Sequence, residues 1–257
     1  MDEARAHEQV AILCKVLRTE ARSFLPGKRL LKIGSGFCVF LAVTRRDYGL
    51  EIFGVEPSSA GFDSSYQLGR EILAQYGLDP AVVRDASAES LPWPDGSFDL
   101  VYSTNVLEHV AAPDQAVREA FRVLKPGGYA QFVYPNYGSF FEGHYALPWI
   151  PHLPKALAKI WVRLWGRDPA FVETLQLLTE KDARRWGGRP EVEALDFGRE
   201  IFMERLTSRR FSTWAGLGRV KKWVDFLHRA GLADLCGKAL LAGRAYTPII
   251  LTCRKRG

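Results

Sequence analysis

The residues with the clearest chemical meaning lie in a glycine-containing turn and at a carboxylate that follows it along the chain. Gly34 and Gly36 come directly after the apolar run 29–33 and before a stretch with helical periodicity. Glycines at a strand-to-helix turn let the backbone approach a ligand closely at a helix N-terminus. Glu56 stands 22 residues after Gly34, at the end of the next apolar run. From that position an acidic side chain can accept hydrogen bonds from ribose hydroxyls, so the pair predicts a nucleoside site.

The same turn departs from a dinucleotide-binding fingerprint. That fingerprint would place a third glycine at position 39, where this chain has Val39. A pyrophosphate would be harder to accommodate there, which favours a nucleoside without phosphates. A nicotinamide-dependent oxidoreductase is therefore disfavoured.

Further segments follow the turn in a defined order. They are Arg84 to Ala86, Glu89 to Val101, Asn105 to Val110 and Arg122 to Gly128. In this order and spacing, the series resembles the class I S-adenosylmethionine-dependent methyltransferases, specifically the type 11-like, small-molecule subgroup. The resemblance covers Leu30 to Pro135 well and the last predicted strand loosely, and it does not cover residues 136–190. It implies methyl transfer to a small-molecule or lipid-like acceptor, with S-adenosyl-L-methionine as cofactor.

The resemblance also implies which residues bind the cofactor. They are Gly34, Ser35, Gly36, Glu56, Pro57, Asp85, Ala86 and Asn105. The loop backbone at Gly34 and Gly36 would face the amino acid portion and the ribose, and Glu56 would hold the ribose hydroxyls. Asp85, with the Ala86 amide nearby, would contact adenine, and the Asn105 carbonyl would be available to the ammonium. A turn or a helix cap is the structural alternative for several of these residues, but four loops at one sheet edge agree.

Two positions depart from the family pattern. Lys32 stands on the first predicted strand where these enzymes usually carry an acidic residue, and Cys38 replaces the usual third loop glycine. A cation at position 32 would weaken the binding of a cationic sulfonium. These departures motivate a second hypothesis, a non-catalytic binding protein that retains the fold.

Methyl transfer from a sulfonium mainly requires alignment and a dry pocket, because the positive charge already activates the leaving group. A hydroxyl acceptor also needs a general base, and histidine is best matched to neutral pH. We predict that His144, with Tyr145, has this role, since both follow the fifth predicted strand, where acceptors bind in open α/β sheets. His109, in the family motif, is the second candidate; packing at a helix start is its structural alternative.

The elements that position these residues alternate between strand and helix. Strands are predicted at 29–33, 51–55, 81–84, 98–103, 129–134, 191–197 and 247–254, and helices at 4–24, 37–48, 67–76, 113–124 and within 213–243. Lys125 to Gly128 is predicted to end the preceding helix before the fifth strand. The alternation predicts an α/β fold, a doubly wound and mostly parallel seven-stranded sheet with right-handed crossovers. Residues 1–135 would form the cofactor-binding core, 136–190 a helical lid insertion for the acceptor, and 191–257 the rest of the same sheet.

The insertion is rich in aromatic, proline and basic residues and carries no strand signal. It places apolar residues at helical spacing, flanked by basic ones: Leu157, Ile160, Trp161, Leu164 and Trp165, with Lys155, Lys159, Arg163 and Arg167. A lid helix packed on its own domain is the favoured interpretation, because such stripes are usually core. The alternative is peripheral contact with an anionic membrane, where a lipid-linked acceptor would be reached.

The basic character of the chain is local. Up to Pro135 there are 14 Lys and Arg against 17 Asp and Glu, and beyond it 21 against 12. This asymmetry fits an anionic partner, such as a phospholipid surface, a phosphorylated substrate or nucleic acid, and equally a solvated basic face. Nucleic acid is disfavoured, since no Asn-Pro-Pro-Tyr-like motif follows the fourth predicted strand.

The cysteines indicate neither a metal site nor a disulfide framework. Cys14, Cys38, Cys236 and Cys253 lie far apart, without a Cys-x-x-Cys pair or a histidine at ligand spacing. Isolated thiols fit the cytoplasm. The first ten residues lack an apolar core segment, and no apolar run approaches the roughly 20 residues that span a bilayer. We therefore expect a cytoplasmic protein that binds no metal, with peripheral membrane contact as a hypothesis.

Overall fold

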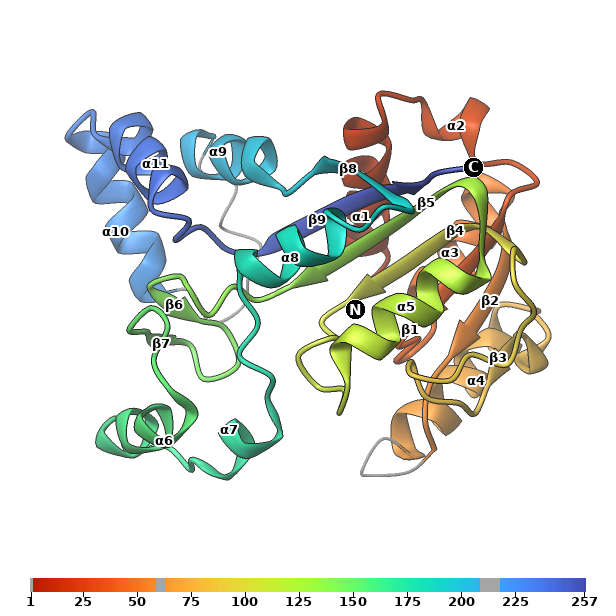
Figure 1. Ribbon diagram of the computed structural model, residues 1–257, viewed down its shortest axis with the longest axis horizontal. Helices are drawn as coiled ribbons and strands as arrows, with labels where there is room; N and C mark the ends of the chain where they lie inside the picture. Colours follow the sequence, from red (N-terminus) through yellow and green to blue (C-terminus); the bar gives the residue numbers. More distant parts are fainter. Residues whose placement is uncertain (1, 59–62, 209–217) are drawn as a thin grey trace. The chain divides into compact units, whose positions relative to one another are not determined.

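The computed structural model describes residues 2–58, 63–208 and 218–257. Its main sheet has seven strands in the order β3-β2-β1-β4-β5-β9-β8 (Figure 1). The strands are β1 (Arg29–Ile33), β2 (Glu51–Val55), β3 (Val83–Arg84), β4 (Phe98–Thr104), β5 (Leu124–Tyr134), β8 (Val192–Asp196) and β9 (Ile249–Lys255). β1 pairs in parallel with β2 and β4, β2 pairs in parallel with β3, and β8 is antiparallel to β9. The predicted α/β fold with a doubly wound, mostly parallel seven-stranded sheet is confirmed.

The chain divides into two compact units, which we call the sheet unit and the helical unit. The sheet unit comprises Met1–Phe132, Arg185–Asp196 and Leu251–Gly257, and the helical unit comprises Val133–Arg184 and Phe197–Ile250. Helices that begin in the sheet unit are α1 (Glu3–Leu17), α2 (Ala21–Phe24), α3 (Val39–Tyr48), α4 (Asp63–Gln75), the short 3-10 helix η1 (Pro80–Val82) and α5 (Pro113–Val123). The predicted domain boundaries at 135 and 190, and the role of the insertion as a lid, stay predictions.

The helical unit contains a two-stranded hairpin and most of the remaining helices. These elements are β6 (Phe141–Glu142), β7 (Leu147–Pro148), α6 (Lys155–Leu164), α7 (Ala170–Thr174), α9 (Arg199–Thr207), α10 (Gly218–Arg229) and α11 (Ala233–Ala242), and α8 (Glu180–Gly187) begins here. The expectation that residues 136–190 hold no strand was wrong, because β6 and β7 pair antiparallel within them. Such two-residue strands leave no alternating pattern to detect. Of the predicted helical region 213–243, residues 213–217 lie outside the described ones.

The strand order explains where the helices of the sheet unit lie. β1 leads through α3 to β2 on one side, whereas β4 leads through α5 to β5 on the other. Because parallel crossovers are right-handed, these two helices cover opposite faces of the sheet. β1 is buried along most of its length, from Leu30 to Ile33, as expected for a strand covered on both faces. The order of the strands reverses between β1 and β4, which is where ligands bind in open α/β sheets.

Several element boundaries differ from the sequence prediction, and for three of them the structure shows how the chain runs instead. The N-terminal helical region divides into α1 and α2, because Arg18 adopts a left-handed conformation after α1. The third strand is shortened to Val83–Arg84, since Asp79 caps η1 by accepting a hydrogen bond from the Ala81 amide. β5 begins at Leu124 instead of after Gly128. The predicted break does end the helix, but the chain then continues directly as a strand.

The helical unit has its own apolar core. This core contains Tyr137, Trp149, Ala158, Val162, Val172 and Leu175, all of them buried. Buried Asn136 ties the start of the unit to its C-terminal part by donating through Nδ2 to the carbonyls of Arg244, at 2.9 Å, and Tyr246, at 2.7 Å. Among the described residues, no helix combines the length and apolarity needed to cross a membrane.

Candidate functional site

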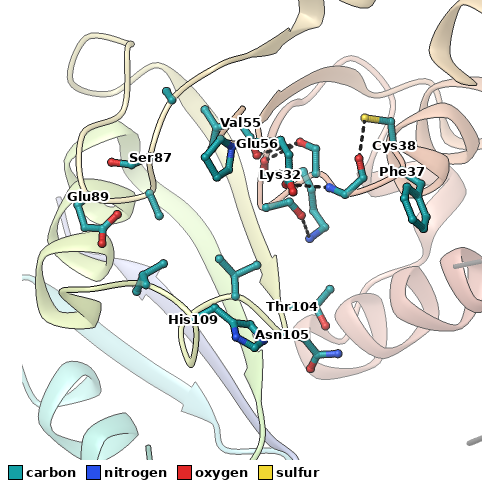
Figure 2. Close-up of a pocket in the computed structure, with 18 of the residues that line it drawn as sticks. Lys32, Phe37, Cys38, Val55, Glu56, Ser87, Glu89, Thr104, Asn105 and His109 are labelled. Carbon is teal, nitrogen blue, oxygen red and sulfur yellow. Dashed lines mark hydrogen bonds between the residues drawn. The ribbon is translucent and has the colours of Figure 1, made fainter. Parts of the chain in front are cut away.

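A cavity of about 490 Å³ opens in the sheet unit at the carboxyl ends of β1, β2 and β4 (Figure 2). This volume lies in the usual range for small-molecule sites. It is lined by the ends of these strands, by the segments that follow them and by the turn after β3. The lining residues are Lys32, Gly34, Ser35, Gly36, Phe37, Cys38, Val39, Val55, Glu56, Pro57, Ala86, Ser87, Ala88, Glu89, Thr104, Asn105, Val106, His109, Val110 and Ala111. The cavity therefore collects four loops that are far apart in the sequence.

The turn after β1 depends on two glycines for different reasons. Gly34 has a φ of +66°, and a Cβ there would lie only 2.2 Å from a methyl carbon of Val106. Close packing against the loop after β4 therefore excludes a side chain. Gly36 has a φ of +50°, and a Cβ there would meet no atom within 4 Å. Its bare backbone leaves room for a ligand to approach the turn.

Glu56 joins the turn after β1 to the end of β2. Its carboxylate is 5% exposed and accepts a hydrogen bond from the Gly36 amide at 2.9 Å. Burial raises the pKa of Glu56, although the Gly36 amide and the charge of Lys32 act in the opposite direction. A carboxylate offers about four acceptor sites. Glu56 can therefore hold the turn and still accept hydrogen bonds from two vicinal hydroxyls.

Lys32 is buried beneath the turn, with 2% of its surface exposed. Its Nζ donates to the carbonyl of Gly34 at 2.9 Å and to that of Ile33 at 3.3 Å. Burial lowers the pKa of Lys32 to about 8, against the opposing effect of Glu56 and other nearby groups. The cation that the sequence places on β1 therefore belongs to the cavity wall.

Cys38 keeps the backbone conformation that a third loop glycine would have. Its φ is +57°, and its side chain is buried. Gly69 on α4 makes room for it, because a Cβ on Gly69 would lie 2.7 Å from the Cys38 sulfur and 2.5 Å from the Gly36 carbonyl oxygen. A left-handed non-glycine residue costs roughly 1–2 kcal/mol, which the surrounding packing must offset. Burial raises the pKa of the thiol to about 12, so Cys38 is an unreactive packing residue.

Asp85 and Ala86, which follow β3, differ in their relation to the cavity. Ala86 lines it, whereas Asp85 is not one of the lining residues. The exposed Asp85 carboxylate accepts hydrogen bonds from the amide of Ser58, at 2.8 Å, and from its hydroxyl. These bonds lower the pKa of Asp85. The acid thus links the loops after β2 and β3.

The loop after β4 contributes Asn105 and His109. Asn105 is exposed and has a φ of +51°, a conformation that asparagine adopts more readily than most residues. His109 lies on the same loop, with Nε2 3.9 Å from a carboxylate oxygen of Glu108, which is fully buried. Seven of the eight predicted cofactor residues, together with His109, line one cavity.

Sequence reasoning missed Phe37, Thr104, Ser87 and Glu89 as lining residues. Phe37 is 45% exposed, which is unusual for so large an aromatic side chain. The position of Phe37 directly after Gly36 could have predicted that it lines the cavity, because a residue next to a ligand-binding turn lies close to the same ligand. An exposed aromatic ring at a cavity can pack against a ligand.

Comparison with known proteins agrees with this geometry. Residues 31–132 match the family model described as "Methyltransferase domain". The matched range is similar to a methyltransferase domain. It holds β1, β2, β3, β4 and nearly all of β5, so every loop of the cavity lies within the matched range.

Two mycobacterial relatives extend the likeness. An uncharacterised protein of Mycobacterium tuberculosis is 29% identical over 207 residues, covering 77% of this chain and 68% of that protein. An uncharacterised methyltransferase of Mycobacterium sp. (strain KMS) is 35% identical over 142 residues, covering 55% of this chain and 52% of its own length. The chain thus spans about half the length of that second relative.

A solved structure shows the same fold. Geranyl diphosphate C-methyltransferase from Streptomyces coelicolor, in complex with Mg²⁺, geranyl diphosphate and S-adenosyl-L-homocysteine, has a TM-score of 0.58 at 15% identity. The match covers 97% of this chain and 77% of that one. The two chains therefore share the same Rossmann-like fold.

Beyond the range that matches the family model, His144 and Tyr145 lie in the helical unit, between β6 and β7. Buried Glu142 accepts a hydrogen bond from His144 Nδ1 at 2.7 Å and from the Tyr145 amide at 2.6 Å. Burial would raise the pKa of Glu142, but these hydrogen bonds and the charge of His144 hold it below its usual value. The Tyr145 hydroxyl donates to the Asp168 carbonyl at 2.7 Å. A buried carboxylate thus orients an imidazole.

Glu142 was not a predicted site residue. Its sequence signal was weak, since a glutamate two positions before a histidine is common on any loop. The hairpin turn brings the two side chains together. The ring of Phe171 also lies 5.3 Å from the imidazole of His144, centroid to centroid, and this contact comes from α7.

Proposed function

We propose that the protein transfers the methyl group of S-adenosyl-L-methionine to a small-molecule or lipid-like acceptor. The observation that carries the proposal is the convergence of four loops on one cavity at the carboxyl ends of β1, β2 and β4. This cavity offers a bare backbone at Gly36 and a buried carboxylate at Glu56, the two groups that a nucleoside ligand requires.

The chemical types of the lining residues match the groups of the cofactor. Glu56 would hold the ribose hydroxyls, the backbone from Gly34 to Gly36 would face the ribose and the amino acid portion, and the Asn105 carbonyl would receive the ammonium. Ala86 would lie beside the adenine, with Asp85 contributing through its loop. When bound, S-adenosyl-L-methionine supplies a methyl group activated by the sulfonium charge.

Calorimetry with S-adenosyl-L-methionine and S-adenosyl-L-homocysteine tests the cofactor. We expect both to bind, and Glu56→Gln to weaken both by about 10- to 100-fold, as expected when a charged hydrogen-bonding group is lost. Glu51→Gln is the matched control, because Glu51 begins β2, the strand that Glu56 follows, is exposed and pairs with Arg29. A parent protein that binds neither ligand would overturn the proposal and favour a non-catalytic protein that retains the fold.

For a hydroxyl acceptor, His144 is the proposed general base. Because Nδ1 donates to Glu142, the basic nitrogen of the neutral ring is Nε2. A carboxylate that fixes the tautomer and stabilises the imidazolium is a recurrent arrangement for proton abstraction. Tyr145, whose hydroxyl contacts the Asp168 carbonyl, would help to shape this region. His109, on the cavity wall, is the second candidate base.

The proposed location of the acceptor is an anionic membrane surface, and α6 supports it. Leu157, Ile160 and Leu164 form one stripe of this helix and are 51%, 54% and 76% exposed. The opposite side packs inward through Ala158 and Val162. The favoured prediction that this apolar stripe is core was therefore wrong for these three residues. A contiguous stripe of exposed apolar side chains is a common feature of a binding surface.

The charges around the stripe favour a membrane over a protein partner. Basic residues flank it on the same helix and just beyond: Lys155, Lys159, Arg163 and Arg167. Lys159 pairs with Glu173, whereas Arg163 and Arg167 are exposed. An apolar helix face bordered by cations is the pattern of an interfacial helix that lies on anionic lipid.

A further inference from the structure

Three arginines of the helical unit converge on one buried carboxylate. Glu180, the first residue of α8, is 2% exposed, and its Oε1 accepts hydrogen bonds from Arg184 Nε at 2.7 Å and from Arg199 Nη2 at 2.9 Å. Arg244 Nε lies 4.0 Å from the same oxygen. Burial would raise the pKa of Glu180, but the hydrogen bond from Arg184 and the charge of Arg199 help to hold it below its usual value, so the acid is ionised. We call Arg184, Arg199 and Arg244 the arginine cluster.

The arginine cluster holds more charge than the buried acid requires. Three arginines against one glutamate leave an excess of two positive charges around Oε1. Guanidinium groups gathered at one oxygen repel one another. A carboxylate offers about four acceptor sites, whereas three guanidinium groups carry about fifteen N–H donors. The side chains of Arg184, Arg199 and Arg244 are 41%, 40% and 56% exposed, so a ligand from solvent can reach them. The cluster thus has both the donors and the charge for a second anion.

Two guanidinium groups of the cluster rest on aromatic rings. The guanidinium of Arg184 lies 5.1 Å from the centroid of the Phe197 ring, and that of Arg199 lies 5.8 Å from the centroid of the Tyr246 ring. Such contacts restrict the orientation of a guanidinium, whose planar fork of donors matches the oxygens of a phosphate bidentately. The side chains are therefore arranged for an oxyanion before one binds, which lowers the cost of binding.

Two hydrogen bonds tie the cluster to the carboxyl end of β5. Tyr134, the last residue of that strand, donates through its hydroxyl to the carbonyl of Thr179 at 3.3 Å, and Thr179 precedes Glu180. Asn136 donates through Nδ2 to the carbonyl of Arg244 at 2.9 Å. Ligands of open α/β sheets bind at the carboxyl ends of the strands. The cluster is thus held by the strand end after which we expect the acceptor to bind.

We infer that the arginine cluster binds a phosphate group and that the methyl acceptor carries this group. The second part of the inference rests on the proposed function. Each of the three guanidinium groups has a nitrogen within 4.0 Å of one oxygen, a compact arrangement that fits one phosphate or diphosphate. Nucleic acid or a membrane plane would instead meet charges spread along a surface. The inference narrows the acceptor to phosphate esters, either soluble ones or lipid head groups.

Calorimetry with pyrophosphate and with glycerol 3-phosphate, at low ionic strength, tests the site. We expect the parent to bind both with dissociation constants below about 1 mM, and Arg244→Gln to weaken both by about tenfold or more, as for the loss of one charged hydrogen-bonding group. Arg244 is the residue to replace, because Arg184 and Arg199 keep their hydrogen bonds to Glu180 without it. Thermal unfolding should show little change.

The matched control is Arg229→Gln. Arg229 is an exposed arginine of α10, in the same unit but outside the cluster. Its replacement removes the same charge from the chain, so long-range attraction falls equally in both variants. We expect Arg229→Gln to bind pyrophosphate like the parent. Equal affinities in the parent and in Arg244→Gln, or a parent that binds neither pyrophosphate nor glycerol 3-phosphate, would overturn the phosphate site.

Flotation separates the two sources of the phosphate group. If the ligand is a lipid head group, Arg244→Gln should float less than Arg229→Gln with vesicles of phosphatidylcholine and phosphatidic acid. If the ligand is a soluble ester, both variants should float alike while calorimetry still distinguishes them. Either result supports the site and identifies its source.

Inhibition of methyl transfer tests the assignment to the acceptor. Pyrophosphate should compete with the acceptor, so it should inhibit labelled methyl transfer into a polar-lipid extract about tenfold less effectively in Arg244→Gln than in the parent. Equal inhibition would show that the bound phosphate does not belong to the acceptor. Binding of S-adenosyl-L-homocysteine tests the proposed function separately. If the parent binds pyrophosphate through Arg244 but not S-adenosyl-L-homocysteine, the proposed function fails while the phosphate site stands.

Discussion

The cavity of the sheet unit and the hairpin of the helical unit hold their polar groups by different means. In the cavity, backbone conformation positions the polar groups, since Gly34 and Gly36 have positive φ and Glu56 accepts a hydrogen bond from a backbone amide. In the hairpin, side chains converge on one buried carboxylate, Glu142. A site that depends on backbone conformation needs particular residue types at fixed positions along the chain, so a sequence can reveal it. A site formed by side chains that converge on one group needs no fixed spacing, so a sequence does not reveal it.

The largest expected effect lies in the hairpin. We expect His144→Gln to lower the rate of labelled methyl transfer from S-adenosyl-L-methionine into a polar-lipid extract by about 10²- to 10⁴-fold, the usual contribution of a general base. Cofactor affinity should not change. His152→Gln is the control, because His152 is an exposed histidine of the same unit. An unchanged rate in His144→Gln would leave His109 as the remaining predicted base.

In the cavity, backbone dependence predicts a difference between the two glycines. Gly34→Ala should weaken S-adenosyl-L-homocysteine binding by about 100-fold or more, because its Cβ would collide with Val106 at a strained φ. Gly36→Ala meets no protein atom, so its thermal stability should fall less while ligand binding is still impaired. Calorimetry and thermal unfolding of both variants measure this. Equal stability losses would show that steric contact with Val106 is not what distinguishes the two positions.

The smallest expected effect concerns α6. Replacing Leu157, Ile160 and Leu164 with serine should reduce flotation with vesicles of phosphatidylcholine and phosphatidylserine by about tenfold or more, since the apolar area available to the bilayer is lost. Ala156→Ser, also exposed on α6, is the control. Vesicles of phosphatidylcholine alone should bind the parent weakly. A parent protein that does not float with anionic vesicles would remove the membrane hypothesis.

The loops and strands around the cavity were predictable because their signals are local. Strand ends at Ile33 and Val55 were predicted to the residue, and seven of the eight predicted cofactor residues line the cavity. The prediction was weaker for Asp85, whose carboxylate is engaged by Ser58 from the preceding loop. A contact between two loops depends on how the strands that bear them are aligned, which residue type alone does not specify.

The sequence by itself determined the alternation of strands and helices, the glycine turn and the acid at the end of the second strand. It also showed that Lys32 stands where an acidic residue is usual. These follow from periodicity and from backbone rules that act within a few residues. Only the tertiary structure decided that Glu142 orients His144, that Gly69 makes room for Cys38, and that the apolar stripe of α6 faces outward. Periodicity identifies which residues share a face of a helix. Which face is buried depends on what the rest of the chain packs against it, and that is settled by contacts between residues far apart in the sequence.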